Sequence, residues 1–370
     1  MKNVLFISNH AGFSKFNAPY MKWFHEKGWR VENVSPGIET GYYDEQHNLN
    51  ISRNPFSIKN IIALIKLRKI CKKGKYDLIH CHTPVGGVLG RLCAKYNRND
   101  PNRPKILYTA HGFHFYKGAN IFYWLLFYPI EKLLAKRTDI IITINQEDYS
   151  LAKKYFSTRV ERINGVGVSL DKFKPVSNIE KILIRENNGF LEEDFIIIYC
   201  AQFIKRKNHK FILYNLKYLK DKIPNIKICF VGNGKDEIKI KKIANKLRLS
   251  NFVYFMGYRK DVNVLYAMSD LLISASKQEG FPLNIVEGMA CGLPVVCSNI
   301  RGHRDIVSIA KGNILFDFKD NSFIKAILDL YKNSKKREEI GKMNIEYAKQ
   351  FSIENSLNEM EKIYLSVMQH

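Results

Sequence analysis

The sequence predicts an α/β protein of two doubly wound domains, each a parallel sheet with helices on both faces. Three observations carry this prediction. Short apolar runs typical of buried strands alternate with longer segments typical of helices. The alternation restarts near Asp194, after a stretch at 165–178 that contains Gly and Pro. A length of 370 residues is also sufficient for two separate cores.

The first half alternates strand and helix patterns in order. Strands are expected at 2–8, 30–36, 76–84, 105–113 and 138–148. Helices are expected at 18–28, 57–73, 85–96 and 148–156. The loop after the first strand reads NHAGF, and no G-x-G-x-x-G is found there. This absence argues against a site for NAD or FAD.

The second half repeats the pattern. Strands are expected at 195–203, 226–234, 252–258, 270–276, 294–298 and 312–316. Helices are expected at 210–224, 235–249 and 283–291, with a basic loop at 204–210. We therefore place the domains at 1–172 and 173–345, and expect a C-terminal helix in 346–370 to pack back toward the N-terminal domain. Ligands of open parallel sheets bind beyond the carboxyl ends of the strands, so two such sheets would form a cleft.

Composition limits the classes of partner. The 59 Lys and Arg outnumber the 35 Asp and Glu, for a net charge of +24, which indicates an anionic partner. Anionic lipid or a phosphorylated substrate is favoured over nucleic acid, because no nucleic-acid-binding motif is found. Seven cysteines without a C-x-x-C pair suggest reduced, buried thiols in a cytoplasmic protein. No signal peptide is recognised, and the most apolar run, 121–130, is too short to span a bilayer.

The segment KQEGFPLNIVEGMACGLPVV, residues 277–296, places two glutamates eight residues apart. A Gly-Phe-Pro between them assigns Glu279 to a loop and Glu287 to a helix that Leu283 begins. A glycosidase-like acid/base pair is therefore not implied. The loop amides and the helix N-terminus would form an anion site, where Glu287 could bind vicinal ribose hydroxyls. The alternative is a solvated glutamate on an ordinary strand-loop-helix unit.

The stretch from Gly257 to Val307 closely resembles the retaining family-4 glycosyltransferases, whose GT-B fold has two Rossmann-like doubly wound domains facing across a cleft. The E-x7-E spacing is the most specific element of this resemblance, which covers nearly the whole chain. In the first half, DLIHCHTPVGGVLGR, YTAHGFHF and INGVGVSLDKFKP are similar to bacterial enzymes that build capsule or exopolysaccharide repeats on a lipid carrier.

The resemblance implies roles for single residues. In the family the second Glu of the motif binds the donor ribose, here Glu287, and the first reaches the donor sugar near the reacting centre, here Glu279. A family Lys that neutralises the diphosphate corresponds to Lys207, and a His that contacts the transferred sugar corresponds to His111. Gln202 stands where the family has an Arg, so the phosphate contact of that Arg is not expected at this position.

The resemblance also implies the rest of the donor site. Arg206 or Lys205 is expected to supply the missing positive charge. The backbone near Gly257 and Tyr258 is expected to contact the nucleotide base of the donor and select it. The remaining backbone contacts to sugar and phosphate fall on Gly12, Gly280, Phe281 and Leu283. Glu279, His111 and Lys207 are the residues expected to act in catalysis.

The implied activity is retaining transfer of a sugar, favoured as an N-acetylhexosamine, from a nucleotide diphosphate sugar, favoured as UDP, to a polyprenyl-diphosphate-linked acceptor. Cations and a helix N-terminus would stabilise the leaving diphosphate. No metal or other cofactor is expected, since no D-x-D cluster stands out. The alternatives are a sugar-nucleotide 2-epimerase of the same fold, a glycosyltransferase with a soluble acceptor, and a non-catalytic anion-binding protein of the membrane surface.

Three further motifs receive mainly structural interpretations. His80 and His82 should point to one face of their strand and Cys81 to the other, so a shared metal is disfavoured. Three glycines are expected mainly to allow close packing of helix and strand, and they are Gly86, Gly87 and Gly90. The aromatic run 113–128 is either a core helix or an apolar lip on the acceptor side.

Residues 57–73 read as a basic amphipathic helix. Its apolar stripe consists of Ile58, Ile61, Ile62, Leu64, Ile65, Leu67 and Ile70, and the flanking cations are Lys59, Lys66, Arg68, Lys69, Lys72 and Lys73. We expect the N-terminal domain to bind the anionic inner face of the plasma membrane through this helix, with Trp124 and Tyr128 as additional interfacial residues. The alternative is that the stripe packs on the first sheet while the lysines face water.

Overall fold

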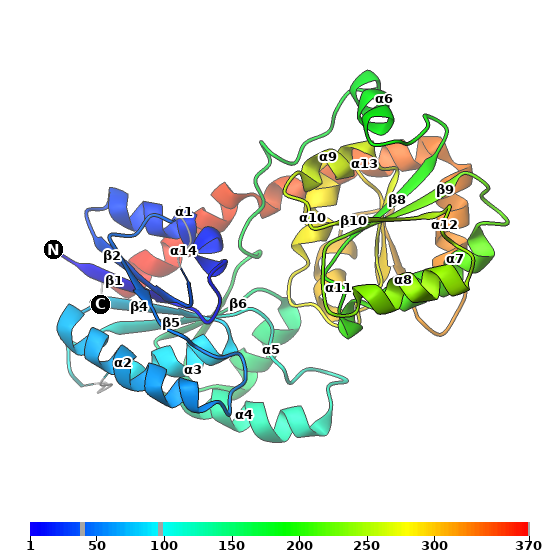
Figure 1. Cartoon of the computed structure of the whole chain (residues 1–370). Coiled ribbons are helices and arrows are strands. Elements are labelled where there is room, and N and C mark those ends of the chain that lie inside the picture. Colours follow the sequence, from blue (N-terminus) through cyan, green and yellow to red (C-terminus); the bar gives the residue numbers. More distant parts are fainter. Residues whose placement is uncertain (38–40, 95–98, 369–370) are drawn as a thin grey trace. The chain divides into compact units, whose positions relative to one another are not determined.

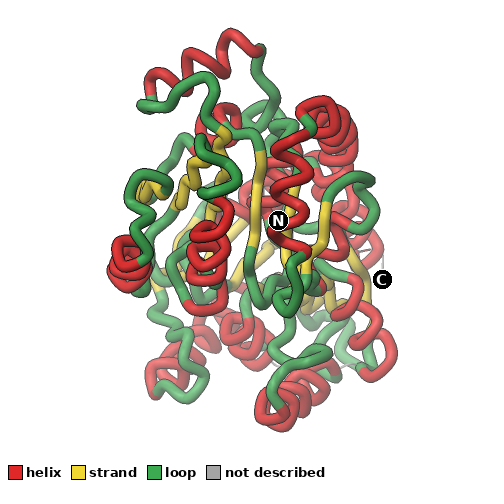
Figure 2. Tube along the Cα trace, turned by 90° about the vertical axis from the view of Figure 1, so that its right-hand side faces the viewer, coloured by secondary structure: helices red, strands yellow, loops and turns green. Residues whose placement is uncertain are grey.

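The computed structural model describes residues 1–37, 41–94 and 99–368. The chain forms two compact units, Met1–Val166 with Ile353–His370, and Gly167–Ser352. The division falls after Val166, where the sequence placed it after residue 172. Each unit is a parallel sheet between two layers of helices, and Figure 2 shows strands with helices on either side.

The N-terminal unit has a seven-stranded parallel sheet of order β3-β2-β1-β4-β5-β6-β7. The strands are β1 (Asn3–Ile7), β2 (Arg30–Ser35), β3 (Glu45–Asn48), β4 (Leu78–His82), β5 (Lys105–Ala110), β6 (Ile140–Thr143) and β7 (Arg159–Arg162). The helices are α1 (Phe13–Glu26), α2 (Ile58–Gly74), α3 (Pro84–Cys93), α4 (Ile121–Ala135), α5 (Gln146–Tyr155) and α14 (Ile353–Met368). Residues 95 and 96 of the expected helix 85–96 lie outside the described residues.

Helices cover both faces of this sheet, as Figure 1 shows. Buried residues of α2, α3, α4 and α5 share one core with one face of the strands. On the opposite face α1 packs against α14, where the ring of Tyr364 lies 4.7 Å from that of Phe24 and 5.6 Å from that of Trp23. The C-terminal helix of the chain therefore belongs to the N-terminal unit.

The C-terminal unit has a six-stranded parallel sheet of order β10-β9-β8-β11-β12-β13. The strands are β8 (Phe195–Cys200), β9 (Ile226–Val231), β10 (Val253–Gly257), β11 (Leu271–Ser274), β12 (Val295–Ser298) and β13 (Ile314–Phe316). The helices are α6 (Asn178–Asn187), η1 (Lys205–Lys207), α7 (His209–Leu219), α8 (Glu237–Lys246), α9 (Val262–Met268), α10 (Leu283–Ala290), α11 (Arg301–Val307), α12 (Ser322–Lys332), α13 (Ser334–Ala348) and η2 (Lys349–Phe351).

The glycines of α3 allow the helix to lie directly on the sheet. A Cβ added to Gly87 would clash with the ring of Tyr108, and one added to Gly90 would clash with the sulfur of Cys81. A Cβ on Gly86 would lie 2.7 Å from Oγ1 of Thr83. The prediction that these glycines serve close packing is confirmed.

The ends of several helices differ from the predicted ones. The first helix begins at Phe13 instead of residue 18 and continues through Pro19, although proline removes one internal hydrogen bond. The helix predicted at 210–224 begins at His209 and ends at Leu219, five residues before Pro224. The basic loop expected at 204–210 contains the short helix η1 and the first residues of α7.

Candidate functional site

An ion-pair cluster around one buried carboxylate lies at the carboxyl ends of two neighbouring strands of the C-terminal unit. β8 pairs with β11, so the loops that follow these strands lie side by side. The Nζ of Lys207 lies 2.5 Å from one carboxylate oxygen of Glu279, and the guanidinium of Arg206 lies 3.0 Å from the other. Arg206 also donates a hydrogen bond to the carbonyl oxygen of Gln278 at 2.9 Å. The structure thus brings together three residues that the sequence proposed separately.

The electrostatics of this cluster favour an ionised carboxylate. Burial alone would raise the pKa of Glu279, but Lys207 and Arg206 outweigh it and lower that pKa to about 2. Burial lowers the pKa of Lys207 from its ordinary value, against the opposing effect of Glu279. The side chain of Lys207 is only 12% exposed, whereas that of Arg206 is 43% exposed. An anion from solvent can therefore reach Arg206 directly.

The loop that carries Glu279 is held against the start of α11. A Cβ on Gly302 would lie 2.7 Å from the carbonyl oxygen of Gly280 and 2.9 Å from that of Glu279, so only glycine allows this approach. Phe281 packs its ring 5.6 Å from that of Phe351. Gly302 was not identified from the sequence, because its neighbours in space lie more than twenty residues earlier.

Glu287 does not belong to the ion-pair cluster. It lies on α10, and the hydroxyl of Tyr266, on α9, donates a hydrogen bond to its carboxylate at 3.2 Å. Burial raises the pKa of Glu287 to about 7, although Tyr266 and Lys172 act in the opposite direction. The two glutamates of the motif therefore differ in charge state near neutral pH. Tyr266 is a contact that the sequence analysis missed.

The other predicted donor residues lie at the same edge of this sheet. Gly257 ends β10 with φ of 66°, and the side chain of the following Tyr258 is exposed. Gln202 and Lys205 are exposed after β8, and Leu283 is the first residue of α10.

Two glycines absent from the sequence analysis shape this edge. They follow β9 and adopt φ of 141° at Gly232 and 156° at Gly234. A Cβ on Gly234 would lie 2.6 Å from the carbonyl oxygen of Phe203, so the loops after β8 and β9 touch through their backbones.

In the N-terminal unit, the predicted residues gather where β1, β4 and β5 end. Gly12 caps α1, and its amide donates a hydrogen bond to Nδ1 of His10 at 3.1 Å. Phe13 packs its ring edge-on against His111, with centroids 4.8 Å apart. The Nε2 of His111 lies 3.2 Å from Nδ1 of His82. The sequence identified His111 but assigned His82 a structural role only.

The two faces of β4 are as predicted. Cys81 lies in the core with α2 and α3, whereas His80 and His82 lie on the other face against Phe6. Nδ1 of His80 is hydrogen-bonded to the hydroxyl of Tyr364, and Nε2 of His80 to the hydroxyl of Thr109, at 2.8 Å each.

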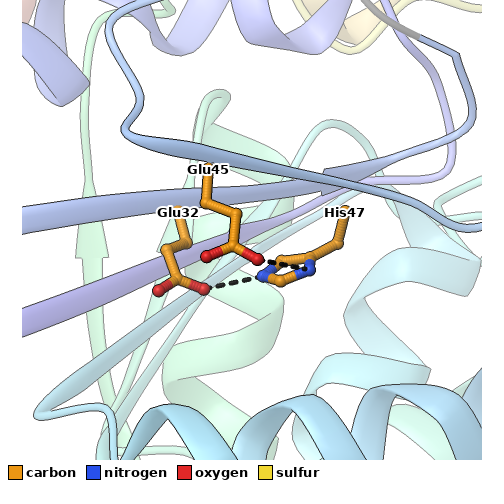
Figure 3. A group of neighbouring side chains, drawn as sticks. All are labelled: Glu32, Glu45 and His47. Carbon is orange, nitrogen blue, oxygen red and sulfur yellow. Dashed lines mark hydrogen bonds and ion pairs between the residues drawn. The ribbon is translucent and has the colours of Figure 1, made fainter.

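One group of metal-ligand type is found within the described residues, at the edge of the N-terminal sheet (Figure 3). Glu32 of β2 and Glu45 and His47 of β3 have ligand atoms within 4.8 Å of one another. The two ring nitrogens of His47 face different carboxylates, 2.7 Å from Glu32 and 3.6 Å from Glu45. Arg30 binds both carboxylates, at 2.8 and 2.7 Å. This arrangement is an ion-pair network that attaches the edge strand; the absence of a metal requirement stays a prediction.

Exposed apolar side chains lie on α2 and α4. Ile58, Ile61, Ile62 and Ile65 are 74%, 62%, 51% and 52% exposed, while Leu67 is buried in the core. Leu64 and Ile70 pack partly against that core, so the predicted stripe is divided between core and surface. On α4 the exposed residues are Ile121, Phe122, Tyr123, Leu125, Ile130 and Leu133. Trp124 and Tyr128, expected at a membrane interface, pack against the core instead. No described helix is long and apolar enough to span a bilayer.

Comparison with known proteins agrees with this architecture. Residues 180–347 match the family described as Glycosyl transferases group 1, and residues 3–145 match Glycosyl transferase 4-like. EpsD of Bacillus subtilis (strain 168), provisionally described as a glycosyltransferase, is 39% identical over 372 residues, covering 99% of this chain and 97% of that protein. The Escherichia coli UDP-Gal:alpha-D-GlcNAc-diphosphoundecaprenol alpha-1,3-galactosyltransferase is 30% identical over 288 residues, covering 75% and 72%.

Two solved structures share the fold. Sucrose-phosphate synthase from Thermosynechococcus elongatus aligns with a TM-score of 0.82 at 18% identity, covering 100% of both chains. Anabaena HepE in complex with UDP aligns with a TM-score of 0.79 at 18% identity, covering 99% of this chain and 100% of that one. The two Rossmann-like sheets are those of the GT-B fold. The chain therefore belongs to the glycosyltransferases. Its N-terminal half matches the family Glycosyl transferase 4-like, and its C-terminal half matches Glycosyl transferases group 1.

Proposed function

We propose that this glycosyltransferase moves a sugar, with retention and without a metal, from a UDP-sugar to a polyprenyl-diphosphate-linked acceptor in the synthesis of a cell-surface polysaccharide. An N-acetylhexosamine is the favoured donor sugar. The observation that carries this proposal is the pair of cations, Lys207 and Arg206, around the buried carboxylate of Glu279. The name of the Escherichia coli relative, which specifies UDP-Gal and a diphosphoundecaprenol acceptor, supports the donor and acceptor classes.

The cluster suggests how the diphosphate is stabilised. Both cations bind Glu279. A diphosphate would compete for them, and the released carboxylate could accept hydrogen bonds from sugar hydroxyls. Charge grows on the diphosphate as the sugar–phosphate bond breaks, and each charge-assisted hydrogen bond contributes roughly 1.5–3 kcal/mol. Preorganised cations thus lower the barrier without acid/base work on the donor.

The retention mechanism is proposed as a same-face displacement. The acceptor hydroxyl attacks the anomeric carbon on the face that the diphosphate leaves, and a leaving phosphate oxygen takes the hydroxyl proton. This chain then supplies electrostatic stabilisation and orientation and no nucleophile. Arg206 takes the place of the family Arg, which is Gln202 here, because its guanidinium lies in the same cluster as Lys207.

We further propose that the N-terminal unit binds the anionic inner face of the plasma membrane. The four exposed isoleucines of α2 are flanked by exposed cations. A hollow of about 360 Å³ beside this helix is lined by Lys59, Lys66, Ile62 and Asn48 among others, and suits a lipid phosphate next to an acyl chain. Basic residues near an anionic surface contribute about 1 kcal/mol each, reduced by salt.

A donor panel tests the activity. Purified protein is incubated with UDP-sugars, with and without a polyprenyl-diphosphate-linked acceptor, and UDP release and the anomeric configuration of the first product are measured. Acceptor-dependent UDP release with retained configuration is expected. Conversion of the donor to its 2-epimer without acceptor would identify the epimerase alternative, and transfer only to soluble glycans would refute the lipid-linked acceptor. Binding without any turnover would identify a non-catalytic protein.

Liposome co-sedimentation across a salt series tests the membrane surface. The variant reverses four cations to Glu, at Lys66, Arg68, Lys69 and Lys72. It should lose binding to anionic vesicles and transfer slowly to a polyprenyl acceptor, yet retain activity on a short soluble analogue. A matched control reverses four exposed lysines of the other unit, at Lys235, Lys239, Lys242 and Lys246. Equal binding of the protein to neutral vesicles, or equal loss in the control, would refute the proposed surface.

A further inference from the structure

Two histidines from neighbouring strands contact each other in the N-terminal unit. His82 ends β4 opposite Thr109 of β5, and His111 follows β5. Nδ1 of His82 lies 3.2 Å from Nε2 of His111. Burial lowers the pKa of His111 to about 4 and that of His82 well below its ordinary value. Both rings are therefore neutral near pH 7, so one of the two facing nitrogens donates a proton and the other accepts it.

The second nitrogen of His82 indicates which ring donates. Its Nε2 is buried and has no hydrogen-bond partner within the described residues. If Nδ1 of His82 were the acceptor, the proton of this ring would lie on Nε2, as a buried N–H without an acceptor, which native proteins rarely contain. If Nδ1 donates, Nε2 is only an acceptor without a donor, which is better tolerated. The geometry therefore favours donation from His82 to His111.

The ring of His82 packs against Phe6, and the backbone that follows it has an unusual conformation. Thr83 adopts φ of 65° and ψ of 155°, a region that is almost restricted to glycine. Its Oγ1 accepts a hydrogen bond from the amide of Asn9 at 3.2 Å. The ring of Phe6 lies parallel to that of His82, with 9° between the planes. Strained residues persist only where their surroundings hold them, and they gather at functional sites.

We propose that His82 is a positioning residue that fixes the proton of His111 on Nδ1, so that His111 presents an N–H donor to an oxygen of the transferred sugar. Within the described residues, Nδ1 of His111 has no partner, and it is not one of the fully buried unpartnered atoms, so it is at least partly accessible. Phe13, edge-on against the ring, limits its rotation. The identity of the ligand rests on the proposed function, whereas the tautomer of His111 does not.

Long-range ¹H–¹⁵N correlation spectra of protein labelled on histidine test the tautomer at neutral pH without any substrate. One ring, assigned to His111 by its loss in His111→Gln, should carry its proton on Nδ1. His82→Phe should shift this ring toward the Nε2–H form that free imidazoles prefer. His82→Asn, whose amide can replace the Nδ1–H donor, should keep the Nδ1–H form. An Nε2–H form of His111 in the wild type would overturn the proposal, even if the variants fail to fold.

Kinetics test the consequence for the reaction. His82→Phe should lower kcat about tenfold with little change in the affinity for the nucleotide sugar, because the N–H group of His111 that it misdirects acts near the reacting centre. His82→Asn should restore most of the lost kcat. His80→Phe is the structural control: it removes the bonds to Thr109 and Tyr364 and should lower thermal stability while leaving the tautomer of His111 unchanged. If His111 carries its proton on Nδ1 in the wild type and His82→Phe nevertheless leaves kcat unchanged, the positioning role is refuted. Absence of glycosyl transfer in the wild type would count against the proposed function alone.

Discussion

Donor binding should depend on pH through Glu287. Burial raises the pKa of this carboxyl to about 7 in the donor-free protein. The proposed ribose contact requires the ionised form, which accepts two hydrogen bonds from vicinal hydroxyls, so a proton on Glu287 competes with the donor. The ionised fraction falls from about nine-tenths one unit above this pKa to about one-tenth one unit below it, so donor affinity should fall about tenfold from pH 8 to pH 6.

Titration calorimetry with a UDP-sugar measures this linkage. The other carboxyl of the motif does not titrate in the same window, since the pKa of Glu279 is lowered to about 2. The UDP-sugar is a better ligand than UDP for this assay, because the terminal phosphate of UDP itself titrates at about pH 6 and would add its own proton exchange. At pH 6, binding should release close to one proton per site, detected as a dependence of the heat on the buffer.

Glu287→Gln is the matched variant for this assay. It keeps the size of the side chain and should bind the donor more weakly, with neither the pH dependence nor the proton release. Constant wild-type affinity across the range would remove Glu287 from the ribose site. The same pH profile in Glu287→Gln would assign the linkage to another group.

The remaining predictions concern the same unit. Between pH 4.5 and pH 8 the folded Glu287 carboxyl holds a proton that the unfolded one has lost, so the stability of the wild type falls as pH rises through this window. Glu287→Gln lacks this titration. Its unfolding free energy should therefore rise relative to that of the wild type by at most about 3 kcal/mol from pH 4.5 to pH 8. Parallel denaturation curves for the two proteins across pH would contradict this. Lys207→Ala and Arg206→Ala should each lower kcat roughly 100-fold, whereas Lys210→Ala, at an exposed lysine, is the control and should not. If Arg206→Ala has no effect while Gln202→Arg raises activity, Arg206 does not replace the family Arg. Gly302→Ala should weaken donor binding, because its Cβ would lie 2.7 Å from the carbonyl oxygen of Gly280; unchanged calorimetry would show that this loop can move freely. Activity should survive excess EDTA, and a loss that Mg²⁺ or Mn²⁺ reverses would refute metal independence.

The sequence alone was sufficient to identify the strands that are buried on both faces. β8, with sequence FIIIYC, is a continuous apolar run, and burial from both sides requires that composition wherever the strand lies in the sheet. β3, with sequence EQHN, was not predicted, because it contains no apolar residue. It is a strand because the edge of β2 is available to it and Arg30 and Glu32 bind its side chains.

The sequence also placed Glu279 and Glu287, because their motif is local and its Gly-Phe-Pro determines loop and helix. It could not supply their partners. Lys207 meets Glu279 across 72 positions because β8 and β11 are neighbours in the sheet, although β9 and β10 lie between them in the chain. Tyr266 reaches Glu287 from α9, the helix before β11, whereas Glu287 lies on α10, the helix after it.

The charge state of these two carboxyls was decided only by tertiary structure. They are the same residue type in one short motif, yet two cations lower the pKa of Glu279 to about 2 and burial raises that of Glu287 to about 7. The pairing of His82 with His111 has the same origin. A pKa or a tautomer depends on which groups share a buried volume, and neighbouring strands of a parallel sheet bring together residues that lie far apart in the chain.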